Sequence, residues 1–109
     1  MAKHEFGILP DPPKPGERYD SYCPQKYRCI RVDDTHLESI AAKFDTIDFY
    51  HHTLDVKGKG LAYCGVTLIP PCSLKAFGEV ICGIPALSVL EKLIGQAQAE
   101  NRWIIHFGL

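Results

Sequence analysis

The sequence lacks most of the features that announce a function. Its five cysteines are odd in number and form no C-x-x-C pair, which argues against a structural zinc ribbon and against a disulfide framework. No apolar run approaches the ~20 residues needed to span a bilayer. Residues 1–5 lead into no apolar segment, so we expect no secretion signal. We therefore predict a cytoplasmic protein with no membrane partner.

A strong net charge and the common catalytic motifs are also missing. The formal net charge of −1 provides no overall field that would recruit nucleic acid or acidic lipid. No dinucleotide-binding, P-loop, serine-elbow or metalloprotease pattern occurs in the chain. Residues 57–60 carry two lysines, but without the P-loop spacing, so we interpret them as part of a solvated turn.

What the chain does contain is the composition of one ordinary globular domain. Its 109 residues, 46% hydrophobic and 23% charged, suffice for one modest core. Five of the eight prolines fall within residues 1–26. We predict that residues 1–26 are a Pro/Tyr-rich N-terminal extension packed on the domain, which comprises residues 27–109. Within the extension, residues 4–9 are expected to form a short edge strand.

Four segments rich in β-branched and aromatic residues are predicted to be strands. They cover residues 27–32, 47–55, 60–69 and 102–107. Residues 56–59, between the second and third strands, contain glycine, which permits the positive φ of a tight reversal. The middle two strands are therefore expected to form a hairpin.

Helical periodicity marks two further regions. Residues 35–44 open with capping-box spacing and continue with an apolar stripe, which predicts a helix. A second helix is predicted to begin at Ser73 as its cap, to break at Gly83 and to restart at Pro85. It ends before Asn101, a residue type that readily takes the left-handed conformation.

The order strand, helix, strand, strand, helix, strand is that of ferredoxin-like folds. We therefore predict an α+β fold, a two-layer ferredoxin-like (βαββαβ) sandwich. Its antiparallel sheet carries the helices on one face, and its second helix is split. Residues 27–32 and 60–69 would be the central strands. The topology alone implies no activity, because this fold hosts many unrelated functions.

Alternation along the strands divides the predicted sheet into a helix-covered face and an open face. The covered face takes Val66 and Leu68 and, from the last strand, Ile105 and Phe107. If residue 55 pairs with residue 60 in the hairpin, Tyr50 and His52 lie on the open face. A shift of the register by one residue would move both to the covered face. The open face then carries an aromatic and basic set: Tyr27, Arg31, Tyr50, His52, Tyr63, Arg102 and His106.

Three interpretations of this open face remain possible. The N-terminal extension packs over it, a second copy of the chain binds it, or it receives a peptide or a small anion. The RNA recognition motif shares the predicted topology, but its sheet stacks bases on aromatic residues within a basic signature. Residues 60–66 hold one outward aromatic residue and no basic one, so no nucleic-acid partner is expected.

The run Tyr50-His51-His52 is the most suggestive local sequence for metal binding. Adjacent residues of a strand point to opposite faces, however, so His51 and His52 cannot hold one ion together. His52 with His106, or His51 with Cys64, would each need a further ligand, and no local motif supplies one. We expect no metal and no cofactor.

Cys72 is the candidate reactive thiol. It follows two prolines at a predicted helix N-terminus, where backbone amides favour the thiolate. Packing on Phe77 as a hydrophobic staple is the stronger interpretation, and no sequence pattern ties a histidine to Cys72. The adjacent carboxylates Asp33 and Asp34 are interpreted as favouring the next helix through its dipole.

These features favour a non-catalytic binding or interaction module. It would use the open sheet face and the N-terminal extension for a partner protein or for self-association. The alternative is a small enzyme or ligand-binding protein with a pocket of histidine, cysteine and tyrosine side chains, at the open face or near Cys72.

Overall fold

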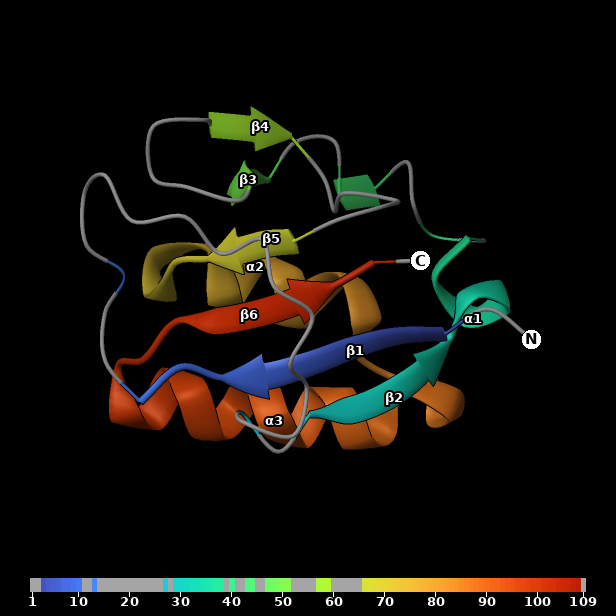
Figure 1. The fold of residues 1–109 in the computed structure, drawn as a ribbon. Coiled ribbons are helices and arrows are strands. Elements are labelled where there is room, and N and C mark those ends of the chain that lie inside the picture. Colours follow the sequence, from blue (N-terminus) through green and yellow to red (C-terminus); the bar gives the residue numbers. More distant parts are fainter. Residues whose placement is uncertain are drawn as a thin grey trace.

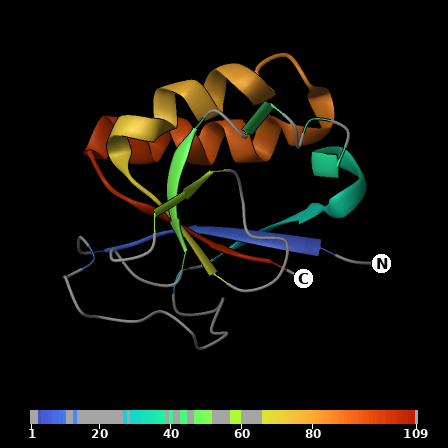
Figure 2. The same ribbon diagram turned by 90° about the horizontal axis from the view of Figure 1, so that it is seen from above.

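The computed structural model describes residues 3–10, 13, 27, 29–38, 40, 43–44, 47–51, 57–59 and 66–108. These residues form an α+β fold in two layers. An antiparallel sheet makes one layer, and the two long helices lie together against one of its faces (Figures 1 and 2). The expected α+β class is confirmed.

Six strands of the described residues join in one sheet, in the order β2-β1-β6-β5-β3-β4. Every neighbouring pair is antiparallel. The strands are β1 (Lys3–Ile8), β2 (Ile30–Asp33), β3 (Asp48–His51), β4 (Lys57–Lys59), β5 (Val66–Ile69) and β6 (Ile104–Phe107).

This strand order differs from a simple ferredoxin-like sheet. β1, expected at an edge, lies between β2 and β6, and β2, whose segment was expected at the centre of the sheet, is an edge strand (Figure 1). The prolines near residues 4–9 suggested an edge position, but the first of them, Pro10, comes after β1 has ended. No proline therefore removes a ladder donor from β1, and an inner position is open to it. Apart from residues 3–10 and 13, the expected extension lies outside the described residues.

The predicted hairpin is also corrected. Lys57–Lys59, expected in the turn, is strand β4 and pairs with β3, with Phe49 opposite Gly58. Residues 52–56, between β3 and β4, lie outside the described part of the chain. On its other side β3 pairs with β5, and Tyr50 lies opposite Leu68 and His51 opposite Thr67. The expected pairing of residues 55 and 60 would instead place residue 51 opposite residue 64, and residues 55 and 60 themselves lie outside the described residues.

Both faces of the sheet carry a buried apolar cluster. The helix-covered cluster includes Phe6, Phe49 and Ile104 with helical residues such as Phe77. The second cluster, on the opposite face, contains Leu9, Val66, Leu68, Ile105 and Phe107. The expected orientation of residues 66–68 and 105–107 is therefore wrong. Every side chain of β5 and β6 is buried, so the apolar pattern could not tell the two faces apart.

The split second helix is confirmed. α2 (Pro71–Ile81) is followed by Gly83 at φ 81°, by the short 3-10 helix η3 (Pro85–Leu87) and by α3 (Ser88–Glu100). Asn101 ends α3 in the left-handed conformation, at φ 54°. Leu90, Ile94 and Ala97 form the buried stripe of α3.

Two predicted helix starts need correction. The first helix, α1 (Asp34–Glu38), is shorter than expected, and its segment continues through hydrogen bonds spanning three residues, as from Ile40 to Leu37. α2 begins two residues before the expected cap. Pro71 is its first residue, and the amide of Ser73 donates to Pro70 O at 3.0 Å, so Ser73 is not the cap.

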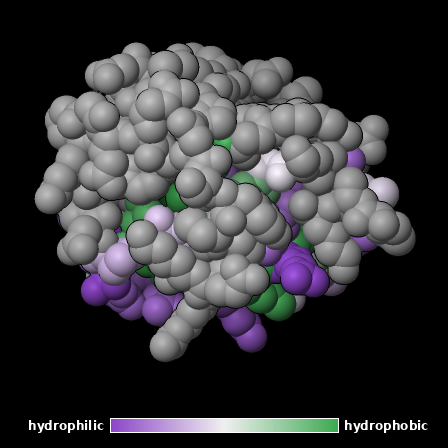
Figure 3. All heavy atoms as spheres, viewed as in Figure 1, coloured by the Kyte–Doolittle hydropathy of each residue, from purple (hydrophilic) through white to green (hydrophobic). Residues whose placement is uncertain are grey.

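Among the described residues, no helix is long and apolar enough to cross a membrane. Most outward residues of α3 are polar, among them Glu91, Lys92, Gln96 and Glu100, although Val89 is 58% exposed. Figure 3 shows hydrophilic side chains gathered along the lower margin of the molecule, where Figure 1 places this helix. α3 is thus an amphipathic helix with one buried side.

Candidate functional site

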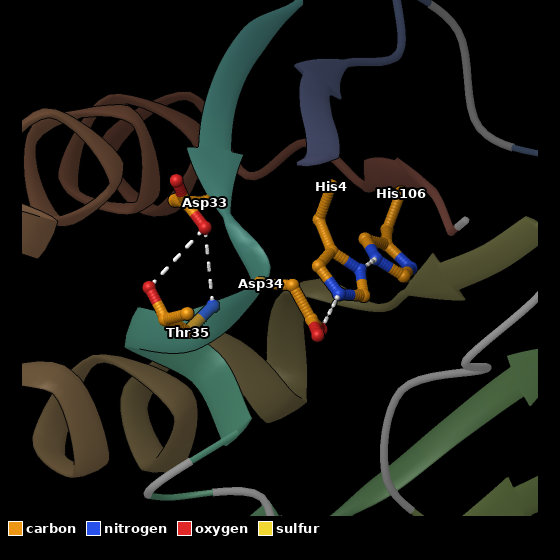
Figure 4. A network of polar contacts seen from close by, with 5 residues as sticks. All are labelled: His4, Asp33, Asp34, Thr35 and His106. Carbon is orange, nitrogen blue, oxygen red and sulfur yellow. Dashed lines mark hydrogen bonds and ion pairs between the residues drawn. The ribbon is translucent and has the colours of Figure 1, made fainter. Parts of the chain in front are cut away.

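A chain of four polar side chains crosses the helix-covered face of the sheet. Asp34 comes from the start of α1, His4 from β1 and His106 from β6 (Figure 4). Thr67 comes from β5. The strand register explains their meeting, because His106 lies opposite Phe6 on one side and opposite Thr67 on the other. We refer to Asp34, His4, His106 and Thr67 as the buried relay.

Short contacts connect the relay from end to end. His4 Nε2 lies 2.8 Å from Asp34 Oδ1, His4 Nδ1 lies 2.8 Å from His106 Nε2, and His106 Nδ1 lies 3.2 Å from Thr67 Oγ1. His106 and Thr67 are fully buried, whereas the Asp34 side chain is 18% exposed. The relay therefore runs from near the surface into the core.

The direction of each hydrogen bond follows from the carboxylate. Ionised Asp34 can only accept, so His4 Nε2–H must donate to it. In a neutral ring this leaves His4 Nδ1 as an acceptor, and His106 Nε2–H donates to it. His106 Nδ1 then accepts from the Thr67 hydroxyl. Every ring nitrogen of the relay has a partner in this tautomeric state.

The two imidazoles meet edge to edge. Their ring centroids are 5.0 Å apart and their planes differ by 18°, while the facing nitrogens are only 2.8 Å apart. These values describe an in-plane hydrogen bond, not stacked faces. One proton lies between the facing nitrogens, and a second would set two N–H groups against each other.

The adjacent carboxylates Asp33 and Asp34 have separate roles. Asp33 Oδ1 accepts the backbone amide of Thr35 at 3.3 Å and the Thr35 hydroxyl at 3.2 Å, so it caps α1 (Figure 4). Asp34 turns instead toward His4. The expected contribution to the helix start therefore belongs to Asp33, through a direct hydrogen bond.

An open pocket of about 470 Å³ lies between α3, the end of β1 and Tyr27. Its apolar lining comes from Ile8, Pro10, Tyr27 and Leu93. Its polar rim comes from Gln96, Glu100 and Arg102. We refer to these seven residues as the α3 pocket.

Gly7 determines how Tyr27 reaches this pocket. A Cβ atom on Gly7 would lie 2.8 Å from Tyr27 Cβ and 2.9 Å from the Tyr27 carbonyl oxygen. Such distances are too short for any side chain, so only glycine lets the segment before β2 lie against β1. The Tyr27 ring also packs near Phe107, with centroids 6.2 Å apart.

The structure brings together only some of the residues expected at the open face. Tyr27 and Arg102 share the α3 pocket. Arg31 is exposed on edge strand β2, with its Nε 3.9 Å from Glu5 Oε2. Tyr50 is half-buried against Trp103, with ring centroids 5.6 Å apart.

The other expected residues have different surroundings. His106 faces the helices and belongs to the buried relay, so its expected place on the open face is wrong. Register explains the error, because Ile105 and Phe107 occupy the opposite face. Cys72 is exposed in the first turn of α2. His52 and Tyr63 lie outside the described residues.

Sequence reasoning missed His4, Asp34 and Thr67 as partners. One signal for His4 was available, since alternation from His4 through Phe6 to Ile8 places a histidine on an apolar side of a strand. Thr67 lay between apolar residues and gave no comparable sign. Among the described residues, no three histidine, cysteine or acidic side chains are grouped so that they could hold a metal ion.

Comparison with protein-family models, with curated proteins and with solved structures found no match to this chain. The roles of the relay and of the pocket are therefore inferred from their own chemistry.

Proposed function

We propose that this chain is a non-catalytic binding protein and that the α3 pocket receives a small molecule. The supporting observation is the pocket itself, an apolar wall beside a charged rim in about 470 Å³. Ligand sites commonly occupy roughly 300–1,000 Å³ and combine apolar lining with a few polar groups. Two residues expected at a binding face, Tyr27 and Arg102, lie in it.

The burial of Thr67 and His106 supports a non-catalytic role. A catalytic hydroxyl or imidazole must reach its substrate. Thr67 and His106 are fully buried, and both ring nitrogens of His106 are engaged within the relay. The relay accordingly serves to hold β1, β6 and β5 in register.

A partner protein or a second copy of the chain would need a different surface from the one first expected. Val66, Leu68, Ile105 and Phe107, at the centre of the face away from the helices, are buried. A small-molecule ligand is therefore the form of the binding hypothesis that we favour. The cytoplasmic location remains a prediction.

A fragment screen by amide NMR tests the proposal. Binding should shift the amide signals of Ile8, Leu93 and Gln96, which line the pocket. Gln96→Trp should fill the pocket and remove these shifts, whereas Lys92→Trp, an exposed position of α3 outside the pocket lining, should leave them unchanged. Equal binding to both variants, or no fragment shifting these signals, would overturn the proposal.

The order of the hydrogen bonds in the relay, as distinct from its burial, favours a second candidate, a small enzyme that uses Thr67 as a nucleophile. A carboxylate, a base and a hydroxyl in a hydrogen-bonded chain are the parts that activate a serine or threonine. A hydroxyl-directed sulfonyl fluoride, with the adduct located by mass spectrometry, tests this role. Labelling of Thr67 that is lost in His106→Gln would support the enzyme, and absence of labelling would reject it.

A further inference from the structure

The rim of the α3 pocket is organised around one carboxylate. Glu100 Oε2 accepts from Gln96 Nε2 at 3.2 Å, and Glu100 Oε1 lies 3.2 Å from Arg102 Nε. The left-handed conformation of Asn101 turns the chain directly after α3, and the Arg102 amide donates to Ala97 O at 2.9 Å. This turn brings Arg102 beside Glu100.

The Glu100–Arg102 pair leaves part of each group available. A guanidinium has five N–H donors, and the contact to Glu100 involves Nε. A carboxylate offers about four acceptor positions, of which Gln96 and Arg102 take two. The side chains of Arg102 and Glu100 are 46% and 40% exposed, so an arriving molecule can reach both.

The charge at this rim discriminates among ligands. Among the described residues that line it, the two opposite charges sum to zero. A lone anion is attracted by Arg102 but repelled by Glu100, and a lone cation is attracted by Glu100 but repelled by Arg102. A molecule with an ammonium and a carboxylate side by side can satisfy both partners. The free α-amino acid is the smallest common molecule with that arrangement.

The apolar lining adds a second requirement. Ile8, Leu93 and Tyr27 present hydrocarbon and an aromatic ring next to the charged rim. A large apolar or aromatic side chain can be buried there while its backbone charges stay at the rim. The volume of about 470 Å³ also accommodates a molecule of this size.

We infer that the α3 pocket binds a free α-amino acid with a large apolar side chain, with Glu100 recognising the ammonium and Arg102 the carboxylate. This inference rests on the proposed function, because it specifies the ligand class of the same pocket. The typical ligand efficiency of small molecules implies a Kd on the order of 1 mM for a ligand of about 12 non-hydrogen atoms.

Four related probes separate the charges. L-phenylalanine carries both charges, its amide only the positive one, N-acetyl-phenylalanine only the negative one, and N-acetyl-phenylalaninamide neither. Amide NMR titrations should show the tightest binding for L-phenylalanine. The singly charged and uncharged probes should bind about two- to five-fold more weakly or worse, which is the range for exposed ion pairs.

Two variants assign the partners. Glu100→Gln should remove the advantage of a free ammonium, so that N-acetyl-phenylalanine binds as tightly as L-phenylalanine. Arg102→Gln should remove the advantage of a free carboxylate, so that the amide of phenylalanine binds as tightly as L-phenylalanine. Glu91→Gln on α3 and Arg31→Gln on β2 are matched charge controls outside the pocket lining and should leave the ranking unchanged.

The outcomes separate a failure of the inferred ligand class from a failure of the proposed function. If the uncharged probe shifts the pocket signals as strongly as L-phenylalanine, the pocket binds ligands but the inferred ligand class is wrong. A ranking that stays the same in Glu100→Gln and in Arg102→Gln also rejects it. If neither these probes nor any fragment shifts the pocket signals, the proposed function itself fails.

Discussion

Two regions of the molecule each contain a carboxylate paired with a basic side chain. In the core the pair is Asp34 and His4, and at the surface it is Glu100 and Arg102. Their contacts measure 2.8 and 3.2 Å. The side chains differ in depth, at 18% and 5% exposed for the core pair but 40% and 46% for the surface pair. Similar contacts therefore have different consequences, because water can replace a lost partner only at the surface.

The two regions also differ in what they leave available. The buried relay uses all its ring nitrogens internally and links three strands to α1. The rim of the α3 pocket keeps donors and acceptors directed toward solvent. Burial thus favours a structural role for the relay, and exposure favours a binding role for the rim. The predictions below test this contrast, beginning with the largest expected effect.

His106→Ala should destabilise the fold by about 3 kcal/mol or more. It removes a fully buried ring and leaves His4 Nδ1 and the Thr67 hydroxyl without their relay partner. Urea unfolding measures the loss. His36→Ala, at an exposed position of α1, is the matched control and should change stability by less than about 0.5 kcal/mol. Similar small losses for both variants would contradict the structural role.

Asp34→Asn should cost about 1 kcal/mol. The asparagine oxygen can still accept from His4, but the hydrogen bond loses its ionic component. Asp33→Asn is the matched control, because asparagine caps a helix about as well as aspartate does. Thermal unfolding of both variants should separate the adjacent carboxylates, and equal losses would contradict their separate roles.

Arg102→Gln should have the smallest effect on stability, less than about 0.5 kcal/mol, because the pair that it breaks is exposed. Urea unfolding alongside Asp34→Asn gives a direct comparison of the two carboxylate–base pairs. A loss of about 2 kcal/mol would mean that the rim contributes to the fold and would weaken its assignment to binding.

Local chemistry made several parts of the structure predictable. Gly83, Pro85 and Asn101 each act through their own backbone preferences, so the split of the second helix and its end follow from single residues. The apolar stripe of α3 likewise follows from helical spacing.

The candidate site was less predictable. Tyr27 and Arg102 were expected at a binding face and share the pocket, but Leu93, Gln96 and Glu100 stood out only as residues of a helix. His106 was singled out and then assigned to the wrong face. Its partners His4 and Thr67 are 102 and 39 residues away in sequence, and no local pattern connects them.

By itself, the sequence determined where most of the described strands and helices lie, since propensity, periodicity and turn chemistry act over a few residues. Lys57–Lys59, expected in a turn and found in strand β4, is an exception. Only the tertiary structure decided that β1 lies between β2 and β6, and hence that His4 meets His106. Strand order and register depend on the burial of both sheet faces at once. When both faces are apolar, alternation no longer distinguishes them, and the packing of the whole chain selects the orientation.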